Sequence, residues 1–128
     1  MGSITDNKYN LTAWQGSTFG LQIQMSQDLS NFSSKMQIRP SYKSAVITES
    51  LSTATGEITI SANTSSTNAN STIQLVLPAD RTANIKVDLT NGRPPKSVYV
   101  YDLEISDSSN NVSKVLYGDF VVYGEVTR

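Results

Sequence analysis

Two carboxylates stand two residues apart in a strongly alternating segment of the chain, at Asp102 and Glu104. In an extended strand, residues at this spacing point to the same face, so the two carboxyl groups would lie side by side. Carboxylate pairs separated by about 5 to 9.5 Å hydrolyse glycosidic bonds. Nothing else in the sequence indicates a sugar cleft, and Lys114 beyond the following turn offers an ion pair across a hairpin. We therefore expect a solvent-facing pair without a catalytic role.

The chain contains no cysteine and no histidine. Their absence excludes disulfides, Cys/His metal sites, Ser–His or Cys–His nucleophilic pairs and a histidine pH switch. No Ser-x-x-Lys or Gly-x-Ser-x-Gly motif supplies another activated nucleophile. Residues 107–111 carry oxygen-bearing side chains, but they lack EF-hand spacing and are typical of a turn. We expect no catalytic, cofactor-binding or metal-binding residues, and no enzymatic activity.

A modest basic stripe runs through Lys35, Arg39 and Lys43, and the first two share one face of a predicted strand. Nucleic-acid binding would need more positive charge and stacking aromatic side chains on that face. The formal net charge of the 128 residues is −1, which also argues against attraction to nucleic acid or anionic membranes. We expect the stripe to be a solvated face or a patch complementary to an acidic partner subunit.

Aromatic side chains could form a carbohydrate-binding platform or an interface. We expect Tyr101 and Trp14 to lie in the core. The places of Tyr117 and Tyr123 remain open, and we predict that the terminal strand carrying them contributes to a subunit contact. The candidate interface residues are Tyr117, Tyr123, Lys35, Arg39 and Arg128.

These residues must be positioned by strands, because period-two alternation of apolar and polar residues dominates the chain. The clearest case is residues 19–25, where Phe19, Leu21, Ile23 and Met25 share one face. Further strands are predicted at residues 9–14, 35–39, 45–51, 57–60, 71–77, 87–89, 97–105 and 112–123.

Other segments are predicted to interrupt the strands. We expect residues 61–70 to form an extended hairpin loop, and Gly118 to mark a bulge. At most one short helix is expected near 79–84, capped by Asp80. About eight strands with almost no helix predict an all-β fold, an antiparallel β-sandwich with an open barrel as second choice. Residues 1–128 are expected to form a single domain, with no secretion signal and no membrane-spanning segment.

Five segments occur in an order that has a parallel in a known family. They are residues 15–19 (QGSTF), 28–32 (DLSNF), 36–39 (MQIR), 99–105 (YVYDLEI) and 118–128, which begins Gly-Asp-Phe and ends Glu-Val-Thr-Arg. This series resembles the immunoglobulin-like domain of bacteriophage tail and baseplate proteins, the type at the N-terminus of baseplate upper proteins.

The resemblance implies an immunoglobulin-like β-sandwich and a structural role in the virion, most directly in the tail or baseplate. Other virion subunits would be the partners, the chain would be multimeric in a particle assembled in the host cytoplasm, and no cofactor would be needed. Two features depart from the family pattern. Residues 61–72 are longer and lower in complexity, and the sequence stops at Arg128, where many members continue into receptor-binding or oligomerising domains. The resemblance therefore implies a structural role without host binding.

Charged residues make up only 16% of the chain, and Ser, Thr and Asn together make up about a third. Residues 9–27 and 58–79 contain no charged side chain. Soluble monomers usually protect sheet edges with charges or proline, so uncharged strands indicate edges covered by a partner. We expect a non-enzymatic protein that acts through subunit contacts. The alternatives are a capsid decoration protein on the phage head and a carbohydrate-binding module with exposed tyrosines.

Overall fold

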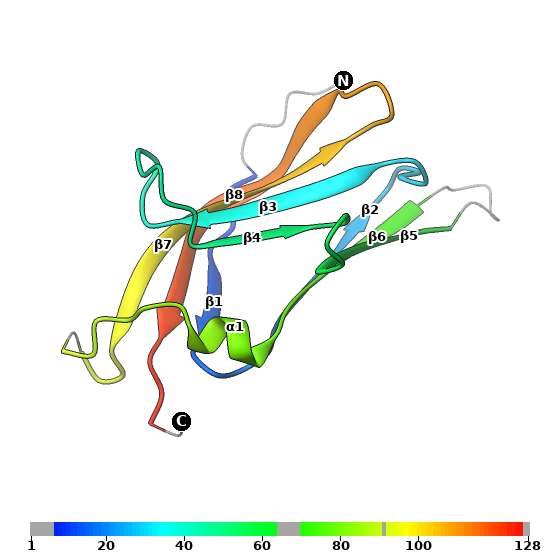
Figure 1. The fold of residues 1–128 in the computed structure, drawn as a ribbon. Coiled ribbons are helices and arrows are strands. Elements are labelled where there is room, and N and C mark those ends of the chain that lie inside the picture. The colour runs from blue at the N-terminus through cyan, green and yellow to red at the C-terminus, as the bar shows by residue number, and fades with distance from the viewer. Residues whose placement is uncertain (1–6, 64–69, 91, 127–128) are drawn as a thin grey trace.

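The computed structural model describes residues 7–63, 70–90 and 92–126, and these form eight strands and one short helix (Figure 1). The helix, α1, confirms the one short helix expected near 79–84. The elements in chain order are β1 (Leu11–Trp14), β2 (Phe19–Met25), β3 (Ser33–Arg39), β4 (Glu49–Ser52), β5 (Ile58–Asn63), β6 (Asn70–Leu77), α1 (Ala79–Ala83), β7 (Lys96–Ser106) and β8 (Val112–Tyr123).

The strands form two sheets, one of five strands in the order β1-β8-β7-β3-β4 and one of three in the order β2-β6-β5. Every neighbouring pair is antiparallel except β1 and β8, which run parallel from Leu11↔Phe120 to Trp14↔Tyr123. This is the arrangement of an immunoglobulin-like β-sandwich. It confirms the predicted fold class, whereas the parallel pairing at one edge is a detail that alternation does not encode.

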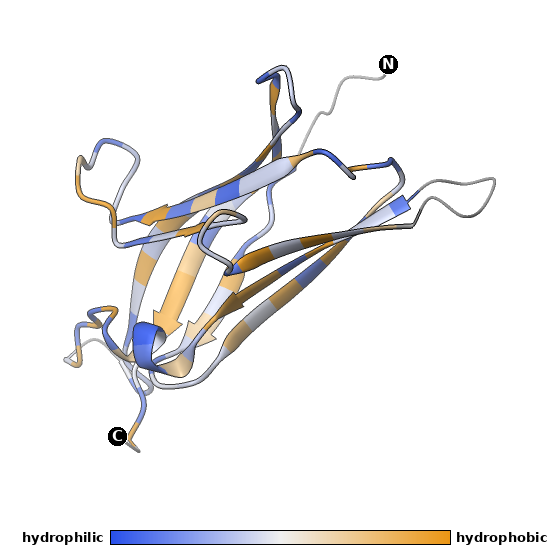
Figure 2. Cartoon of the chain, turned by 45° about the vertical axis from the view of Figure 1, so that its right-hand side comes forward, coloured by the Kyte–Doolittle hydropathy of each residue, from blue (hydrophilic) through white to orange (hydrophobic). Residues whose placement is uncertain are grey.

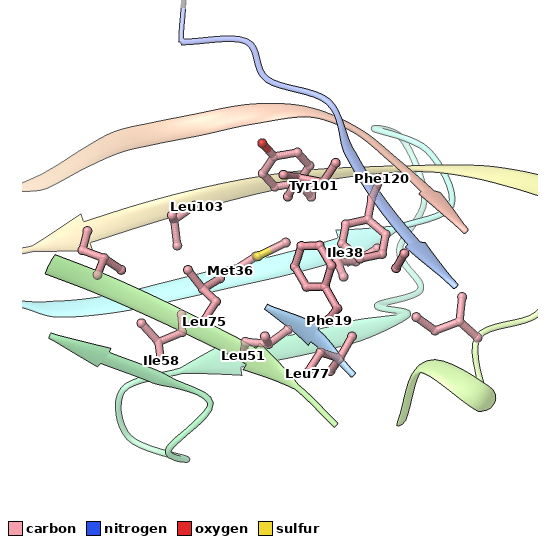
Figure 3. Close-up of a cluster of buried hydrophobic side chains, with 14 of the residues drawn as sticks. Phe19, Met36, Ile38, Leu51, Ile58, Leu75, Leu77, Tyr101, Leu103 and Phe120 are labelled. Atoms are coloured by element: carbon pink, nitrogen blue, oxygen red, sulfur yellow. The ribbon is translucent and has the colours of Figure 1, made fainter. Parts of the chain in front are cut away.

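Hydrophobic and hydrophilic residues alternate along the strands (Figure 2). The core lies between the two sheets, where buried hydrophobic side chains of both sheets meet (Figure 3). Phe19 and Phe120 meet edge to face with ring centroids 5.2 Å apart, which joins the two sheets at one end. Leu29 anchors the β2–β3 connection. Its side chain is fully buried and its N–H donates to the buried Ser71 hydroxyl at 2.9 Å.

Two predicted strands are wrong in part or entirely. Strand β4 begins at Glu49, and the preceding β-branched residues Val46 and Ile47 lie exposed outside it. Residues 87–89 form no strand, and the backbone around Asp88 bonds to side chains instead. The N–H of Asp88 donates to the Ser97 hydroxyl, and the Asp88 carboxylate accepts the N–H of Thr90. High β-propensity without a partner strand does not make a strand at either place.

The predicted loop at residues 61–70 is wrong at both ends. Strand β5 continues to Asn63 and β6 begins at Asn70, and these two residues are paired in the ladder. Backbone pairing thus extends into a segment with few apolar side chains. Residues 64–69 lie outside the described part of the chain.

Gly118 does not mark the bulge, because it pairs regularly with Tyr101. The register shift lies opposite Leu103 and Glu104, where β8 contains Val115 as an extra residue. A Cβ atom on Gly118 would lie 2.7 Å from the carbonyl oxygen of Tyr9. The glycine therefore allows the segment before β1 to approach β8 closely.

The predicted cap of the helix is also wrong. Pro78 occupies the N-cap position, and no side chain caps the helix. Helix α1 is fixed from its other side instead, because the buried Thr82 hydroxyl contacts the carbonyl oxygen of Ser17 at 2.8 Å. The helix thereby closes one end of the sandwich.

Candidate functional site

The three-stranded sheet has no charged residue in any of its strands. Its outward side chains lie in register across the sheet: Gln22 pairs with Gln74, and Gln74 pairs with Thr59. The next row contains Gln24, Thr72 and Ser61. We call this surface the uncharged face; its members are Gly20, Gln22, Gln24, Thr59, Ser61, Thr72, Gln74 and Val76.

The uncharged face presents amide and hydroxyl groups with little internal pairing. The Thr72 hydroxyl contacts Gln24 Oε1 at 3.1 Å, and most of the other side chains of the face are exposed. Such groups can exchange hydrogen bonds with water for hydrogen bonds with a partner, without desolvating a charge.

A groove of about 540 Å³ lies beside strand β2. Ile23 and Met25 of β2 form one wall, and Val115 and Leu116 of β8 form the opposite wall. Phe32 and Ile105 add further apolar surface. Ile23, Met25 and Leu21 are only partly buried, so the sandwich is incompletely closed along this strand.

The five-stranded sheet carries charges of both signs on its outer face. Lys35 lies opposite Glu104 in the β3–β7 ladder. The Arg39 guanidinium donates to Gln37 Oε1 at 2.9 Å and to the carbonyl oxygen of Ser44 at 2.8 Å. Lys35 and Arg39 thus share one face, as predicted, but that face is of mixed charge. Their role as interface residues remains a prediction.

Asp102 and Lys114 form the ion pair predicted across the hairpin, with Nζ and Oδ2 2.7 Å apart. The hydrogen bond to Asp102 raises the pKa of Lys114, so the ammonium group is charged at neutral pH. Asp102 and Glu104 are half-buried on the outer face of β7, and their lack of a catalytic role stays a prediction.

Residues 107–111 form the turn between β7 and β8. The Asp107 carboxylate accepts the N–H groups of Ser109 and Asn111, each at 2.9 Å. It also accepts the Asn111 side-chain amide at 3.0 Å. The side chain of Asn111 is the first cause that lowers the pKa of Asp107. The carboxylate oxygens are thus engaged in stabilising the turn.

Trp14 was expected in the core, and this prediction is wrong: its side chain is 42% exposed. Leu11 and Ala13 of the same strand are buried, so alternation alone places Trp14 on the opposite face, a signal that its large apolar area obscured. The indole stacks on Tyr123 with ring centroids 4.9 Å apart and lines a groove of about 500 Å³ with Leu89, Pro94 and Pro95.

The predictions for the tyrosines have separate outcomes. Tyr101 lies in the core as expected, 2% exposed, with its hydroxyl 2.5 Å from the carbonyl oxygen of Tyr9. Burial raises its pKa. Tyr117 and Tyr123 are half-buried on β8, whose contribution to a subunit contact stays a prediction. Arg128 lies outside the described residues.

One ion cluster, formed by Arg81, Glu49 and Glu57, has no counterpart among the sequence-based predictions. Arg81 of α1 contacts Glu49 of β4 at 2.6 Å and Glu57 beside β5 at 2.5 Å. Burial raises the pKa of Glu57, but hydrogen bonds from Thr55, Arg81 and the backbone outweigh it and lower the pKa to about 2. The cluster joins the two sheets through the helix, and residues so distant in sequence give no local signal of it.

Comparison with known proteins yields distant structural likenesses only. No protein-family model and no curated protein matches the sequence. A family 123 glycoside hydrolase from Clostridium perfringens is 16% identical, with a TM-score of 0.49. That match covers 95% of this chain but 24% of the hydrolase chain, so the present chain spans about a quarter of its length.

Two further solved structures show weaker likeness. A structure from a study of cell-adhesive interactions of VGSC beta subunits is 14% identical, with 98% of both chains covered and a TM-score of 0.40. The sialic acid binding region of a Streptococcus sanguinis SK1 adhesin is 14% identical, with a TM-score of 0.34. That match covers 91% of this chain and 28% of the adhesin chain.

Within residues 7–63, 70–90 and 92–126, no helix is long and apolar enough to cross a membrane. The same residues contain no group of three or more acidic side chains placed to hold a metal ion.

Proposed function

We propose that this protein is a non-enzymatic structural subunit of a phage virion, in the tail or baseplate, that packs its three-stranded sheet against neighbouring subunits. The observation that carries the proposal is the absence of charge from β2, β5 and β6, which together present an exposed face and two uncharged edges. The phage setting is supported by the resemblance of the five ordered segments to tail and baseplate domains.

The uncharged face lacks the charges that keep the copies of a soluble monomer apart. A soluble monomer keeps apart from its copies through charged edges and faces. Here the charged residues of the described part of the chain belong to the other sheet, to helix α1 and to the connecting segments. A stable contact buries about 800 Å² on each partner, and the uncharged face is the surface that would supply it.

The proposal is tested by changing one exposed threonine on each sheet. Thr59→Lys places a charge on the uncharged face, whereas Thr12→Lys adds the same charge to β1 of the other sheet. We expect Thr59→Lys to reduce incorporation of the tagged chain into purified particles at least tenfold, with Thr12→Lys near wild type. Absence of the wild-type chain from the particles, together with strictly monomeric behaviour, would refute the structural role.

A capsid decoration protein would use the same kind of surface on the phage head. Antibody labelling of intact particles separates the two settings, because the label would lie on the tail for one and on the head for the other. We expect the label on the tail or baseplate.

A carbohydrate-binding module is the second candidate, and the exposed Trp14 favours it. The stacked Trp14–Tyr123 pair lies beside a groove whose lining includes Arg93 and Glu125, which could hydrogen-bond a sugar ring. A glycan array decides the question. Tyr42→Ala, at an exposed tyrosine elsewhere on the protein, is the control. Glycan binding that is lost in Trp14→Ala and kept in Tyr42→Ala would favour this candidate.

A further inference from the structure

The backbone orientation of strand β2 follows from one hydrogen bond. The N–H of Val76 donates to the carbonyl oxygen of Glu57 at 2.9 Å, on the β5 side of the central strand. In an antiparallel ladder, the N–H and C=O of one residue point to the same side, and the side alternates along the strand. The backbone N–H and C=O groups of every second residue of β6, counted from Val76, therefore point toward β5. The backbone groups of the residues between them, including Leu75 and Leu77, point toward β2.

The register carries this alternation to β2. Leu75 and Leu77 pair with Leu21 and Phe19. The backbone groups of Phe19, Leu21, Ile23 and Met25 in β2 therefore bond to β6. The N–H and C=O groups of Gly20, Gln22 and Gln24 point to the open edge of the sheet. No other described strand pairs with β2 along this edge.

The side chains next to this edge are also incompletely covered. Ile23 and Met25 form the β2 wall of the groove of about 540 Å³ that separates the strand from Val115 and Leu116 of β8. None of the groove's lining residues belongs to β5, so the other edge of the sheet lacks this feature. An open backbone edge and an apolar groove thus coincide along β2.

We propose that β2 binds an additional strand: an extended, uncharged segment of a neighbouring subunit with an apolar residue at every second position. This inference rests on the proposed function, because it names the partner of the same three-stranded sheet. Only another extended backbone matches the spacing of the free groups of Gly20, Gln22 and Gln24. Alternate side chains of the added strand would point into the groove, and the others would continue the uncharged face.

The charges around the groove support an uncharged occupant. Lys114 and Asp107 are the charged residues of its lining. Lys114 is paired with Asp102, and the Asp107 carboxylate is bonded within its own turn. No described charge is left to select a charged segment, and burying an unpaired charge there would be unfavourable.

The test uses a synthetic peptide with the sequence of residues 71–77, Ser-Thr-Ile-Gln-Leu-Val-Leu, followed by two lysines for solubility. This uncharged segment already pairs with β2 on its other side and has the required alternation. Amide hydrogen exchange is followed by NMR on the whole chain with and without peptide. We expect exchange at Gly20, Gln22 and Gln24 to slow at least tenfold, while Ile60 on the opposite edge is unchanged.

Two substitutions at one position provide a matched pair. Gln22→Pro removes an N–H that points to the open edge, a place where a strand tolerates proline, so the fold should be retained. Gln22→Ala keeps the N–H and shortens the side chain. We expect Gln22→Pro to weaken peptide binding at least tenfold and Gln22→Ala to change it less than threefold. Circular dichroism checks that both variants keep their strands.

Several results would overturn the inference. A peptide of the same composition with its apolar residues contiguous should not bind; equal protection by it would show that alternation is irrelevant. Slow exchange at these amides in the protein alone, increasing with protein concentration, would assign the edge to a second copy. Unchanged exchange with peptide, together with loss of particle incorporation in Thr59→Lys, would refute strand addition and leave the proposed function standing.

Discussion

The two sheets of the sandwich have similar inner faces and dissimilar outer faces. Both contribute fully buried side chains to one core, for example Leu75 from β6 and Leu103 from β7. Outside, the five-stranded sheet carries Lys35, Glu104 and the Asp102–Lys114 pair, whereas the strands of the three-stranded sheet carry no charge and present mainly amides and hydroxyls. The difference separates two surfaces: the core holds the sheets together, and under the proposed function the uncharged face is the surface that meets a partner.

The largest effects should come from the inner faces, where the sheets are alike. We expect Leu75→Ala and Leu103→Ala each to lower the free energy of unfolding by about 2–5 kcal/mol, because both side chains are fully buried. Urea denaturation measures both. A loss below about 1 kcal/mol for Leu75→Ala alone would show that the three-stranded sheet is not packed as tightly as its partner.

The next effect concerns the helix contact that links the sheets. We expect Arg81→Met to lower the free energy of unfolding by about 1–3 kcal/mol at pH 7, because the guanidinium contacts Glu49 and Glu57 in a partly buried site. Glu57 has a folded-state pKa of about 2 against an ordinary value of 4.5. Its charge therefore stabilises the fold above pH 4.5, and this contribution is lost as the pH falls toward 2.

Denaturation of both proteins between pH 7 and pH 2 checks this linkage. The wild type should lose stability through that range, and the Arg81→Met variant should lose less, because one cause of the lowered pKa is gone. Equal pH dependence in the two proteins would mean that Arg81 does not stabilise the Glu57 carboxylate.

A smaller effect is expected from the charged outer face. Lys114→Ala removes the pair with Asp102, which is exposed enough for water to screen it, so we expect a loss of no more than about 1 kcal/mol. High salt should abolish the difference between variant and wild type. A loss above about 2 kcal/mol would show that the charges of this sheet contribute to folding as strongly as its core.

The smallest effect on stability should come from the uncharged face. Gln74→Lys changes an exposed side chain at the centre of that face, and we expect the free energy of unfolding to stay within about 0.5 kcal/mol of the wild type. Thermal denaturation measures it. A larger loss would indicate that the amides of this face stabilise the monomer.

Alternation of apolar and polar residues predicts where strands occur, but it does not predict which strands pair with one another. It places β2 correctly at residues 19–25 and Tyr101 correctly in the core, because one buried face imposes period two on a strand. It fails at residues 87–89 and at Val46, where β-branched residues have no partner strand. Trp14 lies outside the core because the buried Leu11 and Ala13 occupy the inward positions of its strand.

The candidate surfaces show the same limit. The charge-free segments are evident in the sequence, but their union in one sheet depends on long-range pairing between β2 and β6. Both the groove beside β2 and the Arg81 cluster join residues far apart in the chain. Local patterns carry no information about such contacts, whereas the Asp102–Lys114 pair, separated by a single hairpin, was predicted correctly.

The parallel pairing of β1 with β8 has a mechanical consequence. The chain enters β1 at the end where Leu11 meets Phe120 and leaves β8 at the end where Trp14 meets Tyr123. A pull on residue 7 against residue 126 would therefore slide the two strands past each other and load their hydrogen bonds together in shear. A domain joined this way should withstand tension along its length better than one whose terminal strands peel apart bond by bond.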